Sequence, residues 1–210
     1  MLHGDVLDPW SWIAERRVAL AAEPFDGRFA PIEHSPFPRR WEVRAPSTAE
    51  RRARARAVVR AAREKDAPAL SPELWVSSSP PTSSAPPLLA LAAARLQGAA
   101  KEAALRAALR EAALVRGLDV SRADVIAEVA SRTTGLDLSR FLSALRAPAT
   151  ERSVRAAFNA ALDRGVETAP SLVIGEEWLI PGPRTTDEYR EILQRFLARS
   201  VGVPLERIVH

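Results

Sequence analysis

The hydrophobic pattern of this 210-residue chain predicts strands near its two ends and helices between them. Residues 2–7 and residues 28–37 are short apolar stretches typical of strands. Pro31 lies inside the second stretch and indicates an edge strand, because proline has no backbone N–H to donate to a neighbouring strand. Residues 171–175 and 176–180 predict an antiparallel pair of strands much later in the chain.

The central part of the chain predicts helices that have recognisable start and stop signals. Ser47 and Glu50 form a capping box, and an arginine-rich helix is expected from there to about residue 65. Residues 67–87 are rich in proline and serine and predict an irregular connection, with Trp75 as its one large apolar side chain. Five helices are expected between residues 86 and 165, with predicted N-caps and glycine stops at Ser121, Asp137, Thr150, Gly98, Gly117, Gly135 and Gly165.

A last helix is predicted from a second capping box, formed by Thr185 and Glu188. Its apolar residues recur at the spacing that places them on one face of a helix: Tyr189, Ile192, Leu193, Phe196 and Leu197. This face is expected to pack on the core.

The residues that follow the first predicted strand form the start of a helix. Asp8 is a favourable N-cap, and Pro9 suits the first helical position because its missing N–H would have no partner there. Such a junction gathers free backbone N–H groups and the positive end of the helix dipole, which favours an anion or a thiolate. The run Asp8-Pro9-Trp10-Ser11-Trp12 is therefore the first candidate functional site.

Composition removes several kinds of chemistry. The chain is 47% hydrophobic and 27% charged, which is ordinary for a globular protein, and its formal charge of +4 is mild. It has no cysteine, so disulfides, thiolate metal sites and dithiol–disulfide exchange by the chain itself are excluded. Three histidines supply too few ligands for an imidazole metal cluster, so no metal is expected. No membrane-spanning run or secretion signal is apparent, and a cytoplasmic location is expected.

The residues from Asp5 to Trp12 resemble the active-site turn of the DsbA-like branch of the thioredoxin superfamily. That branch includes FrnE-type proteins, kappa-class glutathione transferases and 2-hydroxychromene-2-carboxylate isomerases. Its redox members carry Cys-Pro-x-Cys and its transferases and isomerases carry Ser-Pro-Tyr-Ser-Tyr, so Asp8 stands where the nucleophile would be. A second match follows near the C-terminus, where Gly165-Val166, a short spacer and Ala169-Pro170 resemble the family's cis-proline loop.

This resemblance implies an α/β architecture. The expected fold is a thioredoxin fold with a four-stranded mixed sheet and an inserted all-helical subdomain. The implied division assigns residues 1–45 and 165–200 to the thioredoxin-like core, residues 46–164 to the helical insertion and residues 201–210 to a C-terminal tail. By the same resemblance, Asp8 and Ser11 hold the positions of the catalytic pair. The groove for a ligand would be lined by Pro9, Trp10, Ala169 and Pro170.

Three functions compete for this site. Disulfide oxidoreductase, the activity implied by descent, has no cysteine to carry it unless another protein contributes one. A glutathione-dependent transferase or isomerase is disfavoured, because an ionised Asp8 would repel the thiolate and a helix N-terminus is expected to lower the pKa of Asp8. The third is a non-redox protein that binds a peptide, a partner or a small ligand between Trp10 and Ala169-Pro170. We predict this third function, with Asp8 favoured as a structural cap over a catalytic acid by roughly three to one.

The arginine-rich helix offers the one alternative surface. Its arginines recur at helical spacing and would form a stripe: Arg52, Arg56, Arg60 and Arg63. A solvated face is favoured over a nucleic-acid surface by roughly four to one, because no aromatic side chain for base stacking lies among them. The expected partners are a peptide, a protein or a small thiol ligand, with glutathione the one cofactor left open. Nucleic acid and membrane are not expected, and a homodimer stays open.

Overall fold

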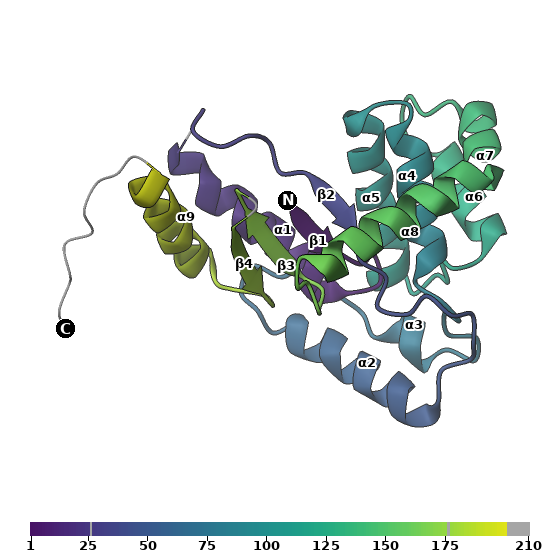
Figure 1. Ribbon diagram of the computed structural model, residues 1–210. Helices are drawn as coiled ribbons and strands as arrows, with labels where there is room; N and C mark the ends of the chain where they lie inside the picture. The colour runs from purple at the N-terminus through teal and green to yellow at the C-terminus, as the bar shows by residue number, and fades with distance from the viewer. Residues whose placement is uncertain (26, 176, 201–210) are drawn as a thin grey trace.

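A four-stranded mixed sheet lies at the centre of the computed structural model, which describes residues 1–25, 27–175 and 177–200 (Figure 1). The strands are β1 (Leu2–Gly4), β2 (His34–Pro36), β3 (Ser171–Ile174) and β4 (Trp178–Pro181), in the order β2-β1-β3-β4. Strand β1 runs parallel to β2 and antiparallel to β3, and β3 pairs antiparallel with β4. The predicted mixed sheet with its second strand at the edge is confirmed.

The strands are shorter than the hydrophobic pattern predicts. Strand β1 ends at Gly4 rather than at residue 7, because the Asp5 side chain accepts a hydrogen bond from the Leu7 N–H at 2.8 Å and turns the backbone. Strand β2 occupies only three residues of the predicted 28–37, so Pro31 lies before it and not within it. The last predicted strand begins at Glu176, which lies outside the described residues, and β4 begins at Trp178.

The predicted helices occur in the predicted order, and one short helix, α3, lies within residues 67–87, which were predicted to be irregular. Their bounds are α1 (Pro9–Ala22), the short 3-10 helix η1 (Glu23–Phe25), α2 (Thr48–Ala61), α3 (Glu73–Val76), α4 (Ala85–Arg95), α5 (Ala99–Leu114), α6 (Ala123–Ser131), α7 (Leu138–Arg146), α8 (Pro148–Asp163) and α9 (Thr186–Ser200). The N-caps Asp8, Ser47 and Asp137 are confirmed, and Thr185 and Glu188 form the second capping box.

Two predicted N-caps are wrong. Helix α6 is preceded by Arg122, because the Ser121 hydroxyl donates to Asp119 instead of capping the helix. Helix α8 begins earlier than predicted, at Pro148, since proline suits the first helical position. Thr150 therefore lies inside α8, and its hydroxyl donates to the Ala144 carbonyl at 2.6 Å.

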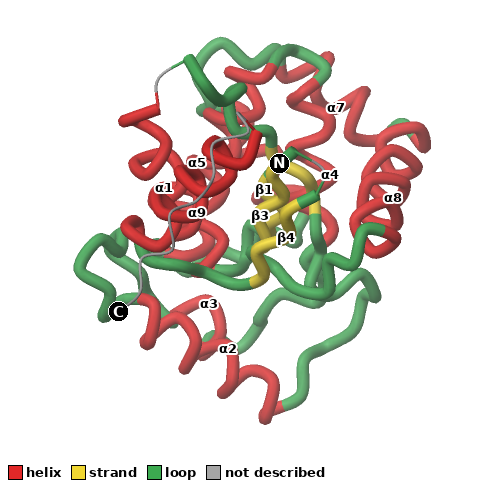
Figure 2. Tube along the Cα trace, turned by 60° about the vertical axis from the view of Figure 1, so that its left-hand side comes forward, coloured by secondary structure: helices red, strands yellow, loops and turns green. Residues whose placement is uncertain are grey.

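Helices cover the sheet unequally. Helices α1 and α9 pack against each other beside the sheet, and α4 to α8 form a block beyond the β2 edge, with α8 packed against β2 (Figures 1 and 2). Tyr189, Leu193 and Leu197 of the predicted α9 stripe are buried. Val6 and Leu7 belong to the hydrophobic core of the helical block, although Leu2 of the preceding strand belongs to the core under α1 and α9. The turn that leads into α1 therefore lies where the two cores meet.

No helix within the described ranges is both long enough and apolar enough to span a bilayer. The predicted tail, residues 201–210, lies outside the described residues.

Candidate functional site

Asp8 is buried at the start of α1 with all of its carboxylate contacts made inside the protein. Its Oδ2 accepts hydrogen bonds from the Ser11 N–H and the Ser11 hydroxyl, both at 2.8 Å. Its Oδ1 accepts a hydrogen bond from Nη1 of Arg39 at 2.8 Å, which also makes an ion pair. The side chain of Asp8 is 1% exposed, whereas that of Arg39 is 38% exposed. The start of α1 therefore already holds the Asp8 carboxylate, and the Arg39 guanidinium covers its outer side.

Asp5 completes the hydrogen-bond network of this turn. Its Oδ2 accepts from the backbone N–H of Arg39 at 2.8 Å, so the same segment contributes both a backbone and a side-chain donor. The Ser11 hydroxyl oxygen accepts from the Asp5 N–H at 3.2 Å while it donates to Asp8. Because buried polar groups are costly when they are unpaired, this reciprocal set stabilises one geometry of the turn.

Burial is the largest influence on the ionisation of Asp8. Burial raises the pKa of Asp8 above its ordinary value of 3.8, and the Arg39 guanidinium and the Ser11 hydrogen bonds oppose this rise without cancelling it. The expected lowering of this pKa by the helix N-terminus is therefore wrong. The sequence could not indicate this, because the desolvation of Asp8 depends on residues distant in the chain.

Replacing Ser11 by alanine tests this network through stability. The Ser11→Ala variant removes one donor to Asp8 and leaves the buried Asp5 N–H without its acceptor. We expect the free energy of unfolding to fall by about 1–3 kcal/mol, measured by urea denaturation. Ser131→Ala is a matched control, because the Ser131 hydroxyl bonds to the Glu128 carbonyl on the surface. A loss no larger than that of the control would contradict the closed network.

The loop with the second predicted pair of site residues lies beside the sheet. The Ala169–Pro170 peptide bond is cis, and the Pro170 carbonyl accepts a hydrogen bond from the Gly182 N–H at 2.8 Å. Ala169 is buried in a small apolar cluster with Phe37 and Val173. No acceptor among the described residues lies within hydrogen-bonding distance of the Ala169 N–H.

The segment that follows β2 connects the two halves of the candidate site. Phe37 packs with Ala169, and Arg39, two residues later, reaches Asp8. Trp41 stacks on Phe158 of α8 with ring centroids 6.0 Å apart, and the guanidinium of Arg155 lies 4.2 Å from the centre of the Trp41 ring. No hydrogen bond joins the loop of Ala169 directly to Asp8 within the described part of the chain. Asp8 and Ser11 are thus brought together, and the loop approaches them through residues 37–39.

Two of the predicted groove residues lie on α1. Pro9 is buried and Trp10 is half-buried at the second helical position. Trp12 packs against the core of the helical block, so its role is structural. Arg39, the residue that completes the site, was not predicted, because it lies in an irregular segment without a hydrophobic period or a motif. In the described residues, no group of three or more His, Asp or Glu side chains could hold a metal ion.

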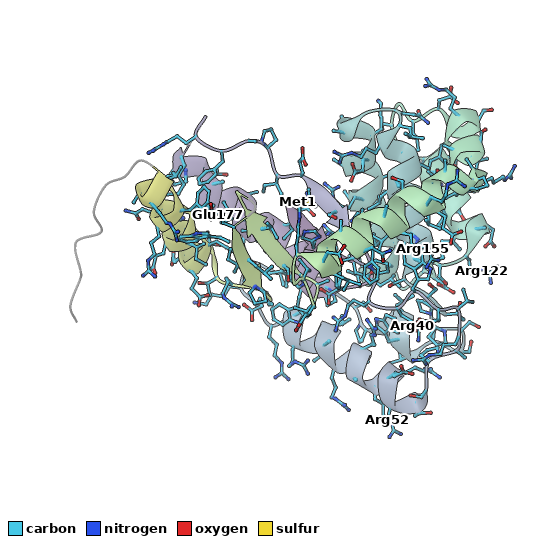
Figure 3. The ribbon with its side chains drawn as sticks, viewed as in Figure 1. Met1, Arg40, Arg52, Arg122, Arg155 and Glu177 are labelled. Carbon is cyan, nitrogen blue, oxygen red and sulfur yellow. The ribbon has the colours of Figure 1, made fainter. Side chains whose placement is uncertain are left out.

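The arginine-rich helix α2 has one inner and one outer set of arginines. Arg51 donates to the carbonyls of Trp75, Val76 and Ser77, and Arg54 lies over the Trp75 ring at 5.3 Å. The predicted stripe is exposed on the other side of the helix, where Figure 3 labels Arg52. Part of the arginine content of α2 therefore fixes this helix to α3.

Comparison with known proteins gives one family and several similar structures. The model of a family described as Thioredoxin matches residues 54–178, more than half of the chain. A "putative protein disulfide isomerase" from Nitrosomonas europaea has a TM-score of 0.81 at 16% identity, covering 94% of this chain and 96% of that one. The cytosolic disulfide reductase DsbM from Pseudomonas aeruginosa, solved with GSH, has a TM-score of 0.70 at 18% identity, covering 93% of this chain and 97% of that one.

A 2-hydroxychromene-2-carboxylate isomerase is also similar, with a TM-score of 0.61 at 16% identity, covering 97% of this chain and 98% of that one. No curated protein matches the sequence. The matched family region begins after the turn of Asp8 and ends after the loop of Ala169 and Pro170. The family model therefore supports the helical segment and that loop. The turn at Asp8 lies outside the matched residues, and its assignment rests on its geometry.

Proposed function

Because this chain belongs to the thioredoxin family and has the fold of its DsbA-like members, we propose that it is a binding protein without dithiol–disulfide chemistry. Its proposed ligand is an extended segment of a polypeptide, which lies between Trp10 and the loop of Ala169 and Pro170. Enzymes of this fold attack a disulfide with a thiolate at the start of the first helix. Here that position has a carboxylate.

The observation that carries this proposal is the closed environment of Asp8. A substrate thiolate at a helix start needs free hydrogen-bond donors and a local positive charge. The Ser11 N–H, the Ser11 hydroxyl and the Arg39 guanidinium are such donors, and all three bond to Asp8. The internal carboxylate thus uses the donors that a substrate anion would need.

The free N–H of Ala169 supports polypeptide binding. An extended peptide binds to a protein edge mainly through main-chain hydrogen bonds, which need an unpaired N–H or carbonyl group on the protein. Ala169 offers such an N–H beside the neutral, apolar side chains of Phe37 and Val173. This kind of contact does not depend on ionisation of Asp8, so it remains when the redox chemistry is lost.

A titration with an unfolded polypeptide tests the proposed function. Reduced, carboxymethylated α-lactalbumin should shift the amide resonance of Ala169 in a saturable way, and Trp10→Ala should weaken this binding about fivefold or more, as loss of an aromatic contact does. Leu20→Ala is a matched control on the distal part of α1, because Leu20 is 44% exposed. Unchanged binding by the Trp10 variant would contradict the groove, and clear insulin reduction by the purified chain would contradict the absence of dithiol chemistry.

Glutathione is the second candidate ligand, and the raised pKa of Asp8 is the observation that favours it. A carboxylic acid can donate to a thiolate only when it is protonated, and burial moves the pKa of Asp8 in that direction. The Arg39 contact opposes it, and we expect no binding of glutathione at about 1 mM or tighter in calorimetry, for the wild type or for Asp8→Ser. Binding that strengthens in Asp8→Ser would instead favour a glutathione-dependent transferase or isomerase.

A further inference from the structure

A cavity of about 230 Å³ lies between the β1–β2 pair, the turn at Asp5 and Val6, and helices α4, α5 and α8. We call it the insert cavity. One wall is apolar and is formed by Leu88, Leu91, Val154 and Ala157. The charged part of the lining, which we call the arginine wall, consists of Arg95 from α4 and of Arg106, Arg110 and the carboxylate of Glu102 from α5. The volume is below the range of about 300–1,000 Å³ typical for drug-sized ligands, so it suits a smaller molecule.

Arg110 is buried in this wall with one edge of its guanidinium unused. Its side chain is 4% exposed, and its Nη1 donates to Glu15 of α1. No acceptor among the described residues lies within reach of its Nε or Nη2, and Nε is fully buried. The Nε–H and Nη2–H groups lie on the same edge of the planar guanidinium, and of the two only Nη2 keeps solvent-accessible surface through which a carboxylate oxygen can reach it. A buried and unused edge of this kind is costly unless something occupies it.

The arginine and glutamate side chains around Arg110 carry one net positive charge. Three guanidinium groups, of Arg95, Arg106 and Arg110, face the carboxylates of Glu15 and Glu102. His34 contacts Glu15 at 3.4 Å but is neutral at pH 7, because burial lowers its pKa to about 4.

The remaining charges at the cavity do not change this balance. Glu33 and the ammonium group of Met1 also line the cavity, have opposite charges and interact with each other. The negative charge of the Asp5 carboxylate is offset by the guanidinium groups of Arg40 and Arg54, and its oxygens accept hydrogen bonds from the backbone N–H groups of Leu7 and Arg39. A ligand with a single negative charge therefore balances the arginine wall, whereas a phosphate dianion would add a second charge beside Glu15 and Glu102.

We propose that the insert cavity binds a small organic monocarboxylate whose carboxylate pairs with Nη2 of Arg110. Its apolar body lies against Leu88, Leu91 and Val154. This site is separate from the proposed polypeptide groove and shares none of the groove side chains Pro9, Trp10, Ala169 and Pro170.

A titration with 3-phenylpropionate tests this site. We expect saturable amide shifts around the cavity with a Kd of about 1 mM or tighter. The uncharged 3-phenylpropan-1-ol, which has the same apolar body, should bind about tenfold more weakly or not at all, because it cannot form the charged pair. Inorganic phosphate should bind no better than the alcohol.

Two variants locate the binding. Arg110→Lys keeps a positive charge beside Glu15 but loses the Nη2–H donors, and we expect its affinity to fall about tenfold. Ala157→Leu fills the cavity from α8 and should abolish binding, while Ala156→Leu, at an exposed position of the same helix, should not change it. Thermal unfolding of each variant checks that it is folded.

The proposal is overturned by no binding of 3-phenylpropionate at about 10 mM. It is equally overturned by alcohol or phosphate binding as tight as that of the carboxylate, or by unchanged affinity in a folded Arg110→Lys or Ala157→Leu variant.

Discussion

Replacing Asp8 and Ser11 by cysteine is expected to give this chain dithiol catalytic activity. The two side chains already meet, since Asp8 Oδ2 and the Ser11 hydroxyl lie 2.8 Å apart at the first turn of α1. A disulfide needs the two Cβ atoms about 3.5–4.5 Å apart, which neighbouring side chains in such contact can reach. The Asp8→Cys/Ser11→Cys variant should therefore form a reversible disulfide and reduce insulin with dithiothreitol as the electron source.

The size of this gain depends on the thiolate at position 8. A free thiol with a pKa of about 8.5 is about 3% ionised at pH 7, and a pKa of about 6.5 raises this to about 75%. The helix N-terminus and Arg39 both favour the thiolate, whereas burial opposes it. We expect turnover at least about tenfold above that of the wild type, which should stay at the uncatalysed background.

Single-cysteine variants are the matched controls for this gain. Asp8→Cys alone and Ser11→Cys alone cannot release a mixed disulfide internally, so they should not turn over. In the double-cysteine variant, an added Arg39→Ala change should raise the pKa of the thiol at position 8, followed by its thiolate absorbance during a pH titration. If the double-cysteine variant forms its disulfide but does not reduce insulin, the site lacks a feature needed for catalysis besides the two cysteines.

The sequence predicted the parts of the fold that depend on local rules. Asp8, Ser47 and Asp137 cap helices because each side chain satisfies an N–H only a few residues away. The edge position of β2 was also predicted, although Pro31, the residue that indicated it, lies outside the strand. The strand bounds were not predicted, because the turn of Asp5 ends β1 through a side-chain hydrogen bond that hydrophobic spacing does not reveal.

The chemistry of the site was harder to predict because it depends on contacts between distant segments. Asp8 was identified, but its partner Arg39 is 31 residues away in an irregular segment. Glu102, Arg106 and Arg110 recur at every fourth position of α5, a pattern usually typical of a solvated helix face. All three are buried in the folded protein, where Glu15 of α1 pairs with Arg106 and Arg110. Their spacing was visible in the sequence, whereas their burial was not.

Glu15 is the carboxylate that connects α1 to the buried arginines of α5, and Glu15→Gln is expected to have the largest effect on stability. Glu15 accepts from Arg106 and Arg110, whose side chains are 10% and 4% exposed. The neutral glutamine side chain of the variant no longer compensates the buried positive charge of Arg106 and Arg110, which costs about 3–5 kcal/mol of unfolding free energy. Glu128→Gln is the matched control, because its partner Arg132 is exposed and the expected loss is under about 0.5 kcal/mol.

The pH dependence of stability gives an independent test of Glu15. Burial alone would raise the pKa of Glu15, but Arg110, His34 and Arg106 outweigh it and hold this pKa below its ordinary value of 4.5. A carboxylate with a lowered pKa in the folded state stabilises the fold above its unfolded-state pKa, and this contribution disappears as the pH falls through the folded-state pKa. The stability of the wild type should therefore fall below about pH 4.5 more steeply than that of Glu15→Gln.

Adding Arg110→Met to Glu15→Gln should restore part of the lost stability, because it removes the charge left unpaired. Equal acid slopes in the wild type and Glu15→Gln, together with no restoration, would mean that the pairing of Glu15 with α5 does not hold the helical block against α1.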